Sequence, residues 1–364
     1  MNRRQFAGTV PALLGSSTLL AACDSGRSDY EAAAARTWRI GTTQETEATA
    51  LRLELVRYAT LAPSSHNTQC WKFKLADRAI TVLPDFTRRC PAVDPDDHHL
   101  FVSLGCAAEN LVIAAAALGL RAEASFDAAS DSVRIALEPA SAVASPQFKA
   151  IVERQCTRGE YDGKPLGVDE LAQLERAGTD DRVKVLLLTE RGRLEQVIEF
   201  VVQGNTAQMN DKAFVDELKA WIRFSGHDAV RLGDGLFAAS SGNPVLPAWI
   251  GETMFDLFFT PKAENDKYAK FLRSSAGVAV FVGEASDKAH WVEVGRACER
   301  FALHATTMGV RCAFVNQPVE VATLRPQFAS FLGIGSQRPN LVVRFGRGPK
   351  LPPSLRRPVR SVIV

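Results

Sequence analysis

The sequence has almost no excess of charge of either sign. Its 43 Lys and Arg residues nearly balance 41 Asp and Glu residues, which leaves a formal net charge of +2 at pH 7. No basic stripe with interleaved aromatic residues occurs, although proteins that bind nucleic acids normally carry one. We therefore expect no nucleic-acid partner. At 46% hydrophobic residues, the composition is that of an ordinary globular chain.

The sequence also lacks a C-x-x-C pair and any cysteine and histidine cluster at zinc-like spacing. Some cysteines could pair in an oxidising compartment, and the sequence leaves their pairing open. Cys106 and Cys298 lie in apolar helical segments, which favours core positions. His98 and His99 are adjacent and would point in different directions on a helix. We expect them at a surface position where the helix starts, and we expect no metal site.

The apolar run near the N-terminus is too short for a permanent membrane span. It follows Arg3 and Arg4 and ends in L-A-A-C at Cys23. This order resembles a twin-arginine export signal at 1–23 that ends in a lipobox; the alternative is a disordered basic N-terminus. The resemblance implies export by the twin-arginine route and a membrane anchor by lipid on Cys23, hence a periplasmic or membrane-anchored lipoprotein. Residues 24–45 are small and polar and are predicted to be a linker.

A polar loop follows a helix that Pro63 must end, because proline cannot supply the N–H that continues it. Residues 57–73 read R-Y-A-T-L-A-P-S-S-H-N-T-Q-C-W-K-F, and strand-like residues 71–75 come next. The loop offers hydroxyls, amides and backbone N–H groups in a row, which suits the edge of a polar planar ligand. The alternative is a simple turn in which Ser and Asn bond their own backbone.

This stretch resembles the signature A-P-S-S-x-N-x-Q-P-W-x-F of the nitroreductase family, whose members hold FMN between two protomers. Cys70 stands where that family usually has proline. The resemblance implies an α+β, nitroreductase-like fold and FMN as cofactor. It also implies that the loop binds the cofactor through Pro63, Ser64, Ser65, His66, Asn67 and Gln69.

Two segments of the chain repeat one pattern. Residues 97–121 and 287–311 align so that Gly105 matches Gly295 and Glu109 matches Glu299, and each segment ends in Gly-x-Arg. Both are predicted to be long helices lined with small residues, which lets two helices approach closely. Shared composition alone is the alternative, but it does not explain the matching Gly, Glu and terminal Gly-x-Arg together.

Arginines in the second half resemble the family's phosphate ligands. Arg154, Cys156 and Arg158 match the opening R-x-S-x-R, with Cys156 in place of serine, and could clamp a phosphate by charge-assisted bonds. Near the C-terminus, P-P-S-L-R-R-P-V resembles the closing segment, with Arg356 as the first choice of ligand and Arg357 as the second. The alternative is that these are solvated surface arginines, and for Arg360 we prefer it.

The distribution of these parts predicts two fused units that form a single-chain pseudo-dimer. The P-S-S-x-N loop occurs only in the first half and the arginines only in the second, so one FMN per chain is expected. The units are predicted at 46–145 and 146–364, with a possible flavin cap at 205–270. The arrangement resembles the two-unit, Acg-like subgroup of the nitroreductase family.

The resemblance implies an FMN-dependent oxidoreductase that transfers hydride or electrons to nitroaromatic or quinone-like acceptors. Its electron donor would be NAD(P)H or another reductant, its acceptor a small aromatic molecule, and no catalytic side chain is expected because the flavin supplies the redox chemistry. An FMN-sequestering or storage protein with little turnover is the alternative. A structural lipoprotein that has lost the flavin is a third reading, which the retained arginines argue against.

Overall fold

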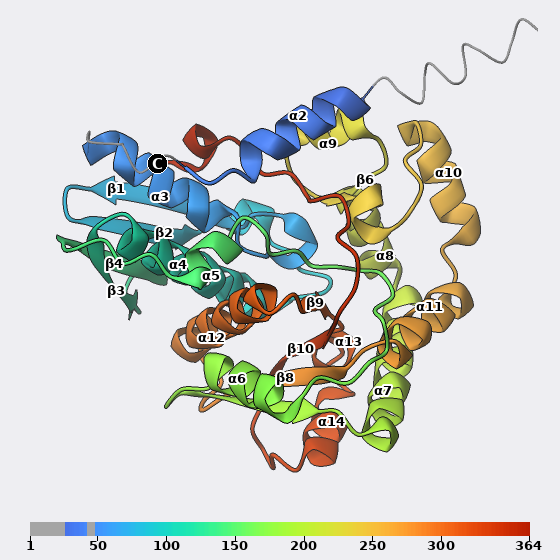
Figure 1. The fold of residues 1–364 in the computed structure, drawn as a ribbon. Coiled ribbons are helices and arrows are strands. Elements are labelled where there is room, and N and C mark those ends of the chain that lie inside the picture. The colour runs from blue at the N-terminus through green and yellow to red at the C-terminus, as the bar shows by residue number, and fades with distance from the viewer. Residues whose placement is uncertain (1–25, 42–47) are drawn as a thin grey trace, which may run out of the picture.

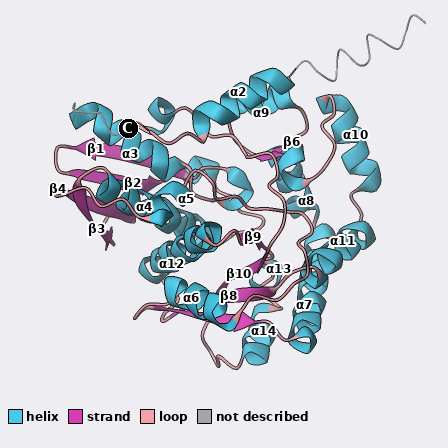
Figure 2. Ribbon diagram, in the orientation of Figure 1, coloured by secondary structure: helices cyan, strands magenta, loops and turns pink. Residues whose placement is uncertain are grey.

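The computed structural model describes residues 26–41 and 48–364. The predicted export signal and its lipid site, Cys23, lie outside these described residues. Two separate four-stranded sheets carry the fold, with helices packed around and between them (Figures 1 and 2). The fold class is therefore α+β, as the resemblance implied.

The first sheet follows helix α3 (Ala48–Thr60). Its strands are β1 (Trp71–Ala76), β2 (Ala79–Pro84), β3 (Leu120–Asp127) and β4 (Ser132–Pro139), in the antiparallel order β1-β2-β4-β3. Helix α4 (His98–Ala117) connects β2 to β3. Successive strand side chains point to opposite faces, so Trp71 and Phe73 share one face, and both are fully buried.

The second sheet has the same plan. Helix α6 (Val168–Gly178) precedes β5 (Val183–Leu188), β8 (Gly277–Gly283), β9 (Arg311–Phe314) and β10 (Pro339–Gly346), and the order is β5-β8-β10-β9. Helix α12 (Lys288–Thr307) connects β8 to β9, as α4 connects β2 to β3. Both sheets thus run first, second, fourth, third in chain order and are antiparallel. The chain is a pseudo-dimer of two fused units.

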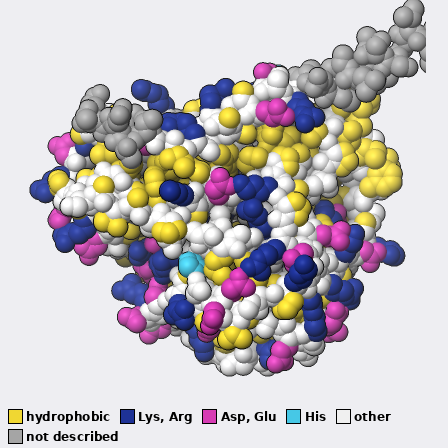
Figure 3. All heavy atoms as spheres, in the orientation of Figure 1, with side chains coloured by type: hydrophobic (Ala, Val, Ile, Leu, Met, Phe, Trp, Pro, Cys, Tyr) yellow, Lys and Arg dark blue, Asp and Glu magenta, His cyan; other side chains and the backbone are white. Residues whose placement is uncertain are grey.

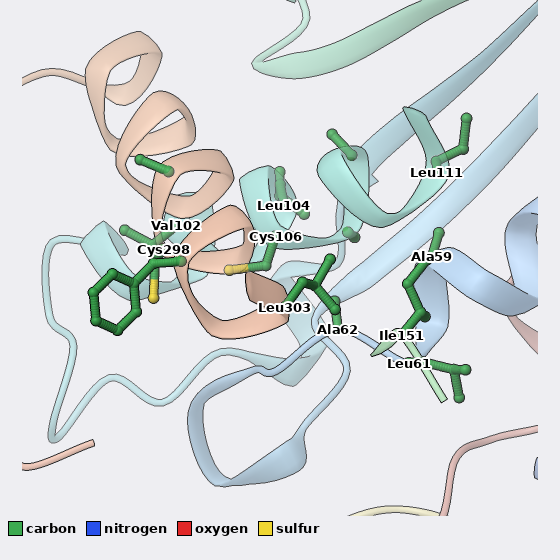
Figure 4. Packing of buried hydrophobic residues seen from close by; sticks show 14 of the residues in the cluster. Ala59, Leu61, Ala62, Val102, Leu104, Cys106, Leu111, Ile151, Cys298 and Leu303 are labelled. Carbon is green, nitrogen blue, oxygen red and sulfur yellow. The ribbon is translucent and has the colours of Figure 1, made fainter. Parts of the chain in front are cut away.

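Two glycines let the central helices of the units touch. A Cβ on Gly105 of α4 would lie 2.0 Å from the carbonyl oxygen of Val292, and a Cβ on Gly295 of α12 would lie 1.9 Å from that of Val102. The contact is reciprocal, as expected between two related units. Around it, α4, α12, α3 and the inner faces of the sheets form one core that includes Cys106 and Cys298 (Figure 4).

Helix α4 is buried along most of its length, including its start. It is long and apolar enough to cross a membrane by length and composition alone, with a mean hydropathy of 1.8, yet 83% of that window is buried inside the protein. The predicted surface position of His98 and His99 is wrong, because they are only 1% and 5% exposed. Residues 316–320 and 338–340 cover them: His99 faces Glu320, and His98 lies 3.0 Å from the Asn340 amide.

Residues 189–276 connect β5 to β8 and are mostly helical, including most of residues 205–270, where the flavin cap was predicted. The helices are α7 (Arg191–Met209), α8 (Lys212–Trp221), α9 (Gly226–Leu232), α10 (Ala248–Phe258) and α11 (Pro261–Arg273). A parallel pair, β6 (Ile222–Arg223) and β7 (Leu236–Phe237), and the turn η3 (Ala238–Ser241) complete this region. We call residues 189–276 the inserted region.

The predicted linker is largely a helix, α2 (Arg27–Thr37), packed on the body of the protein. Its Tyr30 is buried against Phe237, and the Tyr30 hydroxyl donates to the carbonyl of Pro353. Trp38 Nε1 donates to the carbonyl of Ser354 at 2.9 Å. These contacts are invisible in a composition of small polar residues, because they depend on Phe237, 207 positions from Tyr30, and on residues 353–354, more than 300 positions away.

The C-terminal segment returns to the first unit (Figure 1). Ile363 pairs with Phe73 of β1, and the turn η4 (Val359–Val362) places Val362 in the core. The remaining short elements are α5 (Pro146–Ala150), α13 (Gln317–Glu320), α14 (Arg325–Leu332), η1 (Ser65–Asn67) and η2 (Phe86–Arg88).

Candidate functional site

A cavity of about 480 Å³ lies where the two units and the inserted region meet. The first unit contributes the loop from Pro63 to His66 and part of α4, and the second unit contributes Phe314 and Arg344. Most of the remaining wall comes from the inserted region. Cavities of this size with an apolar wall and a few polar groups are typical of small-molecule and cofactor sites.

The loop beside the cavity has a strained backbone. His66, Asn67 and Gln69 have φ values of 47°, 54° and 55°, in the left-handed region that side chains other than glycine disfavour. Such residues persist only where surrounding contacts hold them, and they concentrate at binding sites. Ser64 supports the turn, because its Oγ accepts the backbone N–H of Gln69 at 2.9 Å.

Two amides clamp this loop to distant segments. The Asn67 side chain donates to the carbonyls of Gly235 and Leu355 at 2.9 and 3.2 Å. The Gln69 side chain donates to the carbonyl of Gly233 and accepts the backbone N–H of Arg357 at 2.8 Å. The Asn67 and Gln69 amides therefore have structural partners, and donation from the Asn67 amide to a ligand edge is not available in this arrangement. The hydroxyl of Ser65 has no hydrogen-bond partner among the described residues and lies at the cavity wall.

Arg158 is a predicted phosphate ligand whose positive charge is not paired with any described residue. It lines the cavity and also a smaller neighbouring pocket of about 60 Å³, which lies toward the C-terminal segment. Its guanidinium has no hydrogen bond or ion pair with any described residue. An unpaired guanidinium at a cavity is suited to bind a phosphate or carboxylate.

The backbone around Arg158 is fixed by a second arginine that the sequence reasoning missed. Arg344 of β10 donates to the carbonyls of Thr157 and Gly159, the residues on either side of Arg158, at 3.1 and 2.7 Å. Arg344 is 1% exposed and packs over Tyr161. Burial lowers its pKa from the usual value. A charged residue within the otherwise apolar strand 341–345 was the available signal.

Arg154 is tied into the core. Its guanidinium lies 3.0 Å from the carboxylate of Glu299, which is fully buried, and donates to the carbonyl of Leu61 at 2.6 Å. Burial raises the pKa of Glu299, and the Arg154 charge opposes that rise. Arg154 still lines the smaller pocket. It therefore adds positive charge there while it holds the end of α3.

Arg356 caps the end of α3. It donates to the carbonyls of Thr60, Leu61 and Ala62 at 2.6, 3.0 and 3.1 Å and packs over Trp38. These carbonyls carry the partial negative charge of the helix C-terminus. Burial, followed by the nearby charge of Arg154, lowers the pKa of Arg356 to about 9. The sequence prediction had assigned this residue only a ligand role.

The structure brings most predicted cofactor residues together and leaves two aside. The cavity or its smaller neighbour is lined by Pro63, Ser64, Ser65, His66, Asn67, Arg154, Cys156, Arg158 and Arg356. Gln69 and Arg357 line neither pocket. Gln69 is fully buried, and the two residues serve instead as partners of each other.

Two histidines and an acidic residue form a polar part of the cavity wall. His66 lines it with its Nδ1 3.5 Å from Cys90 Sγ, and burial, reinforced by Arg158, lowers its pKa to about 4. His99 also lines the cavity, and its Nδ1 lies 3.9 Å from the carboxylates of both Asp94 and Glu320. Burial raises the pKa of Glu320. Sequence reasoning missed His99 and Glu320 because it assigned the histidine pair to the surface.

Two groups of potential metal ligands occur among the described residues. They are His66, Cys90 and Glu217, and Asp94, His98 and His99, and within each group the candidate atoms lie within 4.8 Å of one another. Both oxygens of Asp94 accept backbone N–H groups at the start of α4, from His99 and Leu100. Glu217 likewise accepts the N–H groups of Ala92 and Val93. These acids thus have structural roles. Sequence spacing could not have revealed the first group, whose members lie far apart in the chain, whereas the second lies within residues 94–99.

Comparison with known proteins finds relatives along most of the chain, although no family model matches it. Putative NAD(P)H nitroreductase Rv3131 of Mycobacterium tuberculosis is 26% identical over 318 residues, which covers 84% of this chain and 88% of the relative. Putative NAD(P)H nitroreductase acg of the same organism is 24% identical over 322 residues, which covers 84% and 93%.

Solved structures also match. A nitroreductase with bound FMN from Desulfitobacterium hafniense is 14% identical, with a TM-score of 0.39, over 61% of this chain and 98% of that one. The FMN-dependent nitroreductase NfnB from Mycobacterium smegmatis, in complex with NADPH, is 13% identical, with a TM-score of 0.37, over 56% and 87%.

The class that fold and sequence define is that of two-unit α+β proteins related to the nitroreductases. Within that class, the chain is a relative of the putative nitroreductases of the Acg type, as the distribution of the polar loop and the arginines over two units predicted.

Proposed function

We propose that this protein is an FMN-dependent oxidoreductase of the nitroreductase type, with one FMN per chain in the cavity. The observation that carries the proposal is the unpaired Arg158 beside a strained polar loop on a cavity of about 480 Å³. The relatives' names support the same activity class.

The residues present fit FMN. Its phosphate needs positive charge, which Arg158 offers with Arg154 and Arg356 close by around the smaller pocket. Its ring system needs an apolar wall with a few donors, and the loop supplies the Ser65 hydroxyl beside such a wall. Bound FMN would supply hydride or electron transfer to an acceptor.

The residues of this chain would bind FMN, orient the groups that hold it and shield it from water. Arg344 orients Arg158 through the two flanking carbonyls, and Asn67 and Gln69 hold the loop in its strained form. The aromatic residues of α10 and α11 that line the cavity would shield bound FMN from water on that side. Glu320, whose pKa is raised by burial, and His99 offer a proton at the cavity wall to an acceptor that has gained charge.

We further propose that the protein is exported by the twin-arginine route and anchored by lipid on Cys23. The support is the order of arginine pair, apolar run and L-A-A-C in the sequence. Nitroaromatic or quinone-like molecules are the proposed acceptors. NAD(P)H is one candidate donor, and a non-nicotinamide reductant suits an exported protein better because nicotinamide nucleotides are scarce outside the cytoplasm.

A second candidate function is sequestration or storage of FMN with little turnover. The observation that favours it is the inserted region, which covers the cavity on one side and restricts access to it. In that case the protein would hold FMN tightly and resist reduction by soluble donors.

The test starts with protein purified without added cofactor, whose visible spectrum gives the flavin content. Anaerobic mixing with NADH and NADPH follows. One FMN per chain that bleaches within seconds supports the reductase, whereas one FMN that stays oxidised favours sequestration or another donor. Colourless protein that does not bind added FMN would refute both functions.

A further inference from the structure

Helix α10 exposes an unusual amount of apolar surface. Trp249, Leu257, Phe258 and Met254 are 71%, 64%, 63% and 41% exposed, and Val245 just before the helix is 43% exposed. We call these five residues the apolar ridge. Of the whole helix, only Gly251 is buried. Exposed apolar residues are ordinary when scattered, but a contiguous set marks an interaction site.

The same helix forms part of the cavity wall. Met254, Phe255 and Phe258 line the cavity, so two members of the apolar ridge face it and the solvent at once. The rest of the protein contacts α10 through Phe224, which packs on Gly251 and against Phe255, and through Lys219, which lies over the Phe255 ring. Helix α10 therefore forms an apolar part of the cavity wall that is also exposed to solvent.

The N-terminal end of the described chain lies beside the segment that supports α10. A Cβ on Gly26 would lie 2.9 Å from the backbone nitrogen of His227, and a Cβ on Gly226 would lie 2.9 Å from the carbonyl oxygen of Gly26. Phe224, two residues before Gly226, is the residue that packs on Gly251 of α10. The start of α2 and the apolar ridge are thus joined by one short stretch, residues 224–227.

Figures 1 and 3 show the same arrangement on the surface. Hydrophobic side chains gather along the upper right of this face, where α2, α9 and α10 lie. Cys23 precedes Gly26 by three residues, so a lipid attached to it would begin within about 11 Å of Gly26. A lipid anchor and the apolar ridge would therefore approach the same plane.

We propose that α10 inserts its apolar ridge into the headgroup region of a phospholipid bilayer, where it provides a second attachment beside the lipid on Cys23. The proposal rests on the proposed export and lipidation. Stable membrane attachment generally needs two signals, and exposed Trp, Phe and Leu side chains on one short helix are a suitable second one. The cavity would then open next to the bilayer and admit ligands with long apolar tails.

A bilayer suits this ridge better than a protein partner. At 11 residues, α10 is about 16 Å long. A helix of this length alone is too short to bury the roughly 800 Å² on each side that stable protein interfaces bury. Trp249, the most exposed member of the ridge, is of the residue type that prefers the boundary between water and lipid. The charge of Asp256 is compensated within the protein, because Lys219 binds it at 2.6 and 2.8 Å.

The experiment uses the proposed mature chain, residues 23–364 with Cys23→Ser, so that α10 acts without lipid. Vesicles of phosphatidylethanolamine and phosphatidylglycerol are added, and binding is followed by co-sedimentation and by tryptophan emission. We expect binding with a blue shift of the emission. In Trp249→Phe most of the shift should disappear while most of the binding remains, because Trp71 and Trp291 are already buried and Trp38 and Trp221 are partly buried against the core.

The decisive variant is the double substitution Trp249→Ser with Leu257→Ser, two exposed residues that do not line the cavity, and it should weaken vesicle binding about tenfold or more. Val168→Ser is the matched control, since Val168 is 83% exposed on α6, and it should bind vesicles normally. Bound FMN per chain, measured on each variant, reports folding and the proposed function separately from membrane binding.

Two results would overturn the inference. One is vesicle binding that is absent, or equally strong in the double variant. The other is a stable dimer, seen by analytical ultracentrifugation without lipid, that the double variant abolishes, because a second copy would then be what covers the ridge.

Discussion

The two units share a scaffold and differ in their connections. In the first unit the hairpin from β1 to β2 is made by Asp77 and Arg78, whereas in the second unit the equivalent connection from β5 to β8 is the whole inserted region, residues 189–276. The insertion supplies most of the cavity wall, and the first unit supplies the strained loop. Within the described residues, the two units thus keep one plan, while the inserted region and the strained loop meet at the same cavity.

The matched glutamates show the same divergence. Glu109 on α4 meets Arg296 and Arg300 at 2.9 and 3.4 Å, and the side chains of both arginines remain partly exposed. Glu299 on α12 is fully buried and meets Arg154, which is itself buried and lines the smaller pocket. One sequence pattern therefore gives a buried carboxylate with partly exposed arginine partners in one unit and a fully buried carboxylate paired with a buried arginine beside the smaller pocket in the other.

The largest effect should come from breaking the symmetry at the helix crossing. Gly105→Ala and Gly295→Ala each force a Cβ against a backbone oxygen, so each should lower the free energy of unfolding by about 3 kcal/mol or more, measured by urea denaturation. Gly192→Ala is the control, since nothing lies within 4 Å of its Cβ and alanine favours helix α7. Normal stability of either crossing variant would contradict the close packing.

The next largest effect should be a difference in stability between substitutions of the two matched glutamates. Glu299→Gln removes the charge partner of buried Arg154 and should destabilise the fold by about 2 kcal/mol. Glu109→Gln affects arginines that reach solvent and should cost about 0.5 kcal/mol. Equal losses in thermal or urea unfolding would show that the two environments are energetically alike.

Arg158→Ala tests whether the second unit supplies the positive charge that binds the phosphate of FMN. Loss of its charge-assisted bonds should weaken FMN binding about thirtyfold, measured by fluorescence titration of the protein stripped of flavin. Because Arg158 has no partner within the described chain, stability without FMN should hardly change. Arg360→Ala is the control, because Arg360 is exposed in the C-terminal segment. Unchanged affinity in Arg158→Ala would remove the main argument for the phosphate position.

The smallest effect concerns pH. The pKa of His66 is about 4 in the folded protein, below its usual value near 6.5, so the unfolded state binds more protons between these values. Stability should therefore fall as the pH drops from about 6.5 to 4. His66→Asn, which tolerates the left-handed backbone, should reduce part of that fall in pH-dependent thermal melts.

Exposed His227→Asn is the control for this change and should leave the pH profile as it is. His98, whose pKa burial also lowers, stays in both variants, so some acid sensitivity should remain. An identical profile in His66→Asn and the unaltered protein would contradict the assignment.

Periodicity and small residues predicted the parts of the fold that local pattern controls. The repeat around Gly105 and Gly295 predicted two closely packed helices, and Pro63 correctly predicted the end of α3 and a polar loop before β1. The apolar stretch at 341–345 was correctly predicted as a strand. In each case the signal lies within a few residues of the feature it specifies.

Contacts between distant segments could not be predicted. Burial of His98 and His99 depends on residues around 320 and 340, and the capping of α3 by Arg356 joins residues nearly 300 positions apart. The role of the Asn67 amide was missed for the same reason, because its partners are Gly235 and Leu355. The type of a charged or amide side chain predicts that it needs a hydrogen-bond partner when it is buried. It does not predict which distant residue that partner is.

Closure of the site by residues 351–364 has a consequence for biosynthesis. The partner of Asn67 at Leu355, the cap at Arg356 and the pairing of Ile363 with Phe73 all belong to the stretch that the ribosome makes after the rest of this sequence. The polar loop, made early, must wait for them before it can take its final shape. Assembly of the site must therefore follow synthesis of residues 351–364, and a chain truncated after residue 350 would hold both sheets but no finished site.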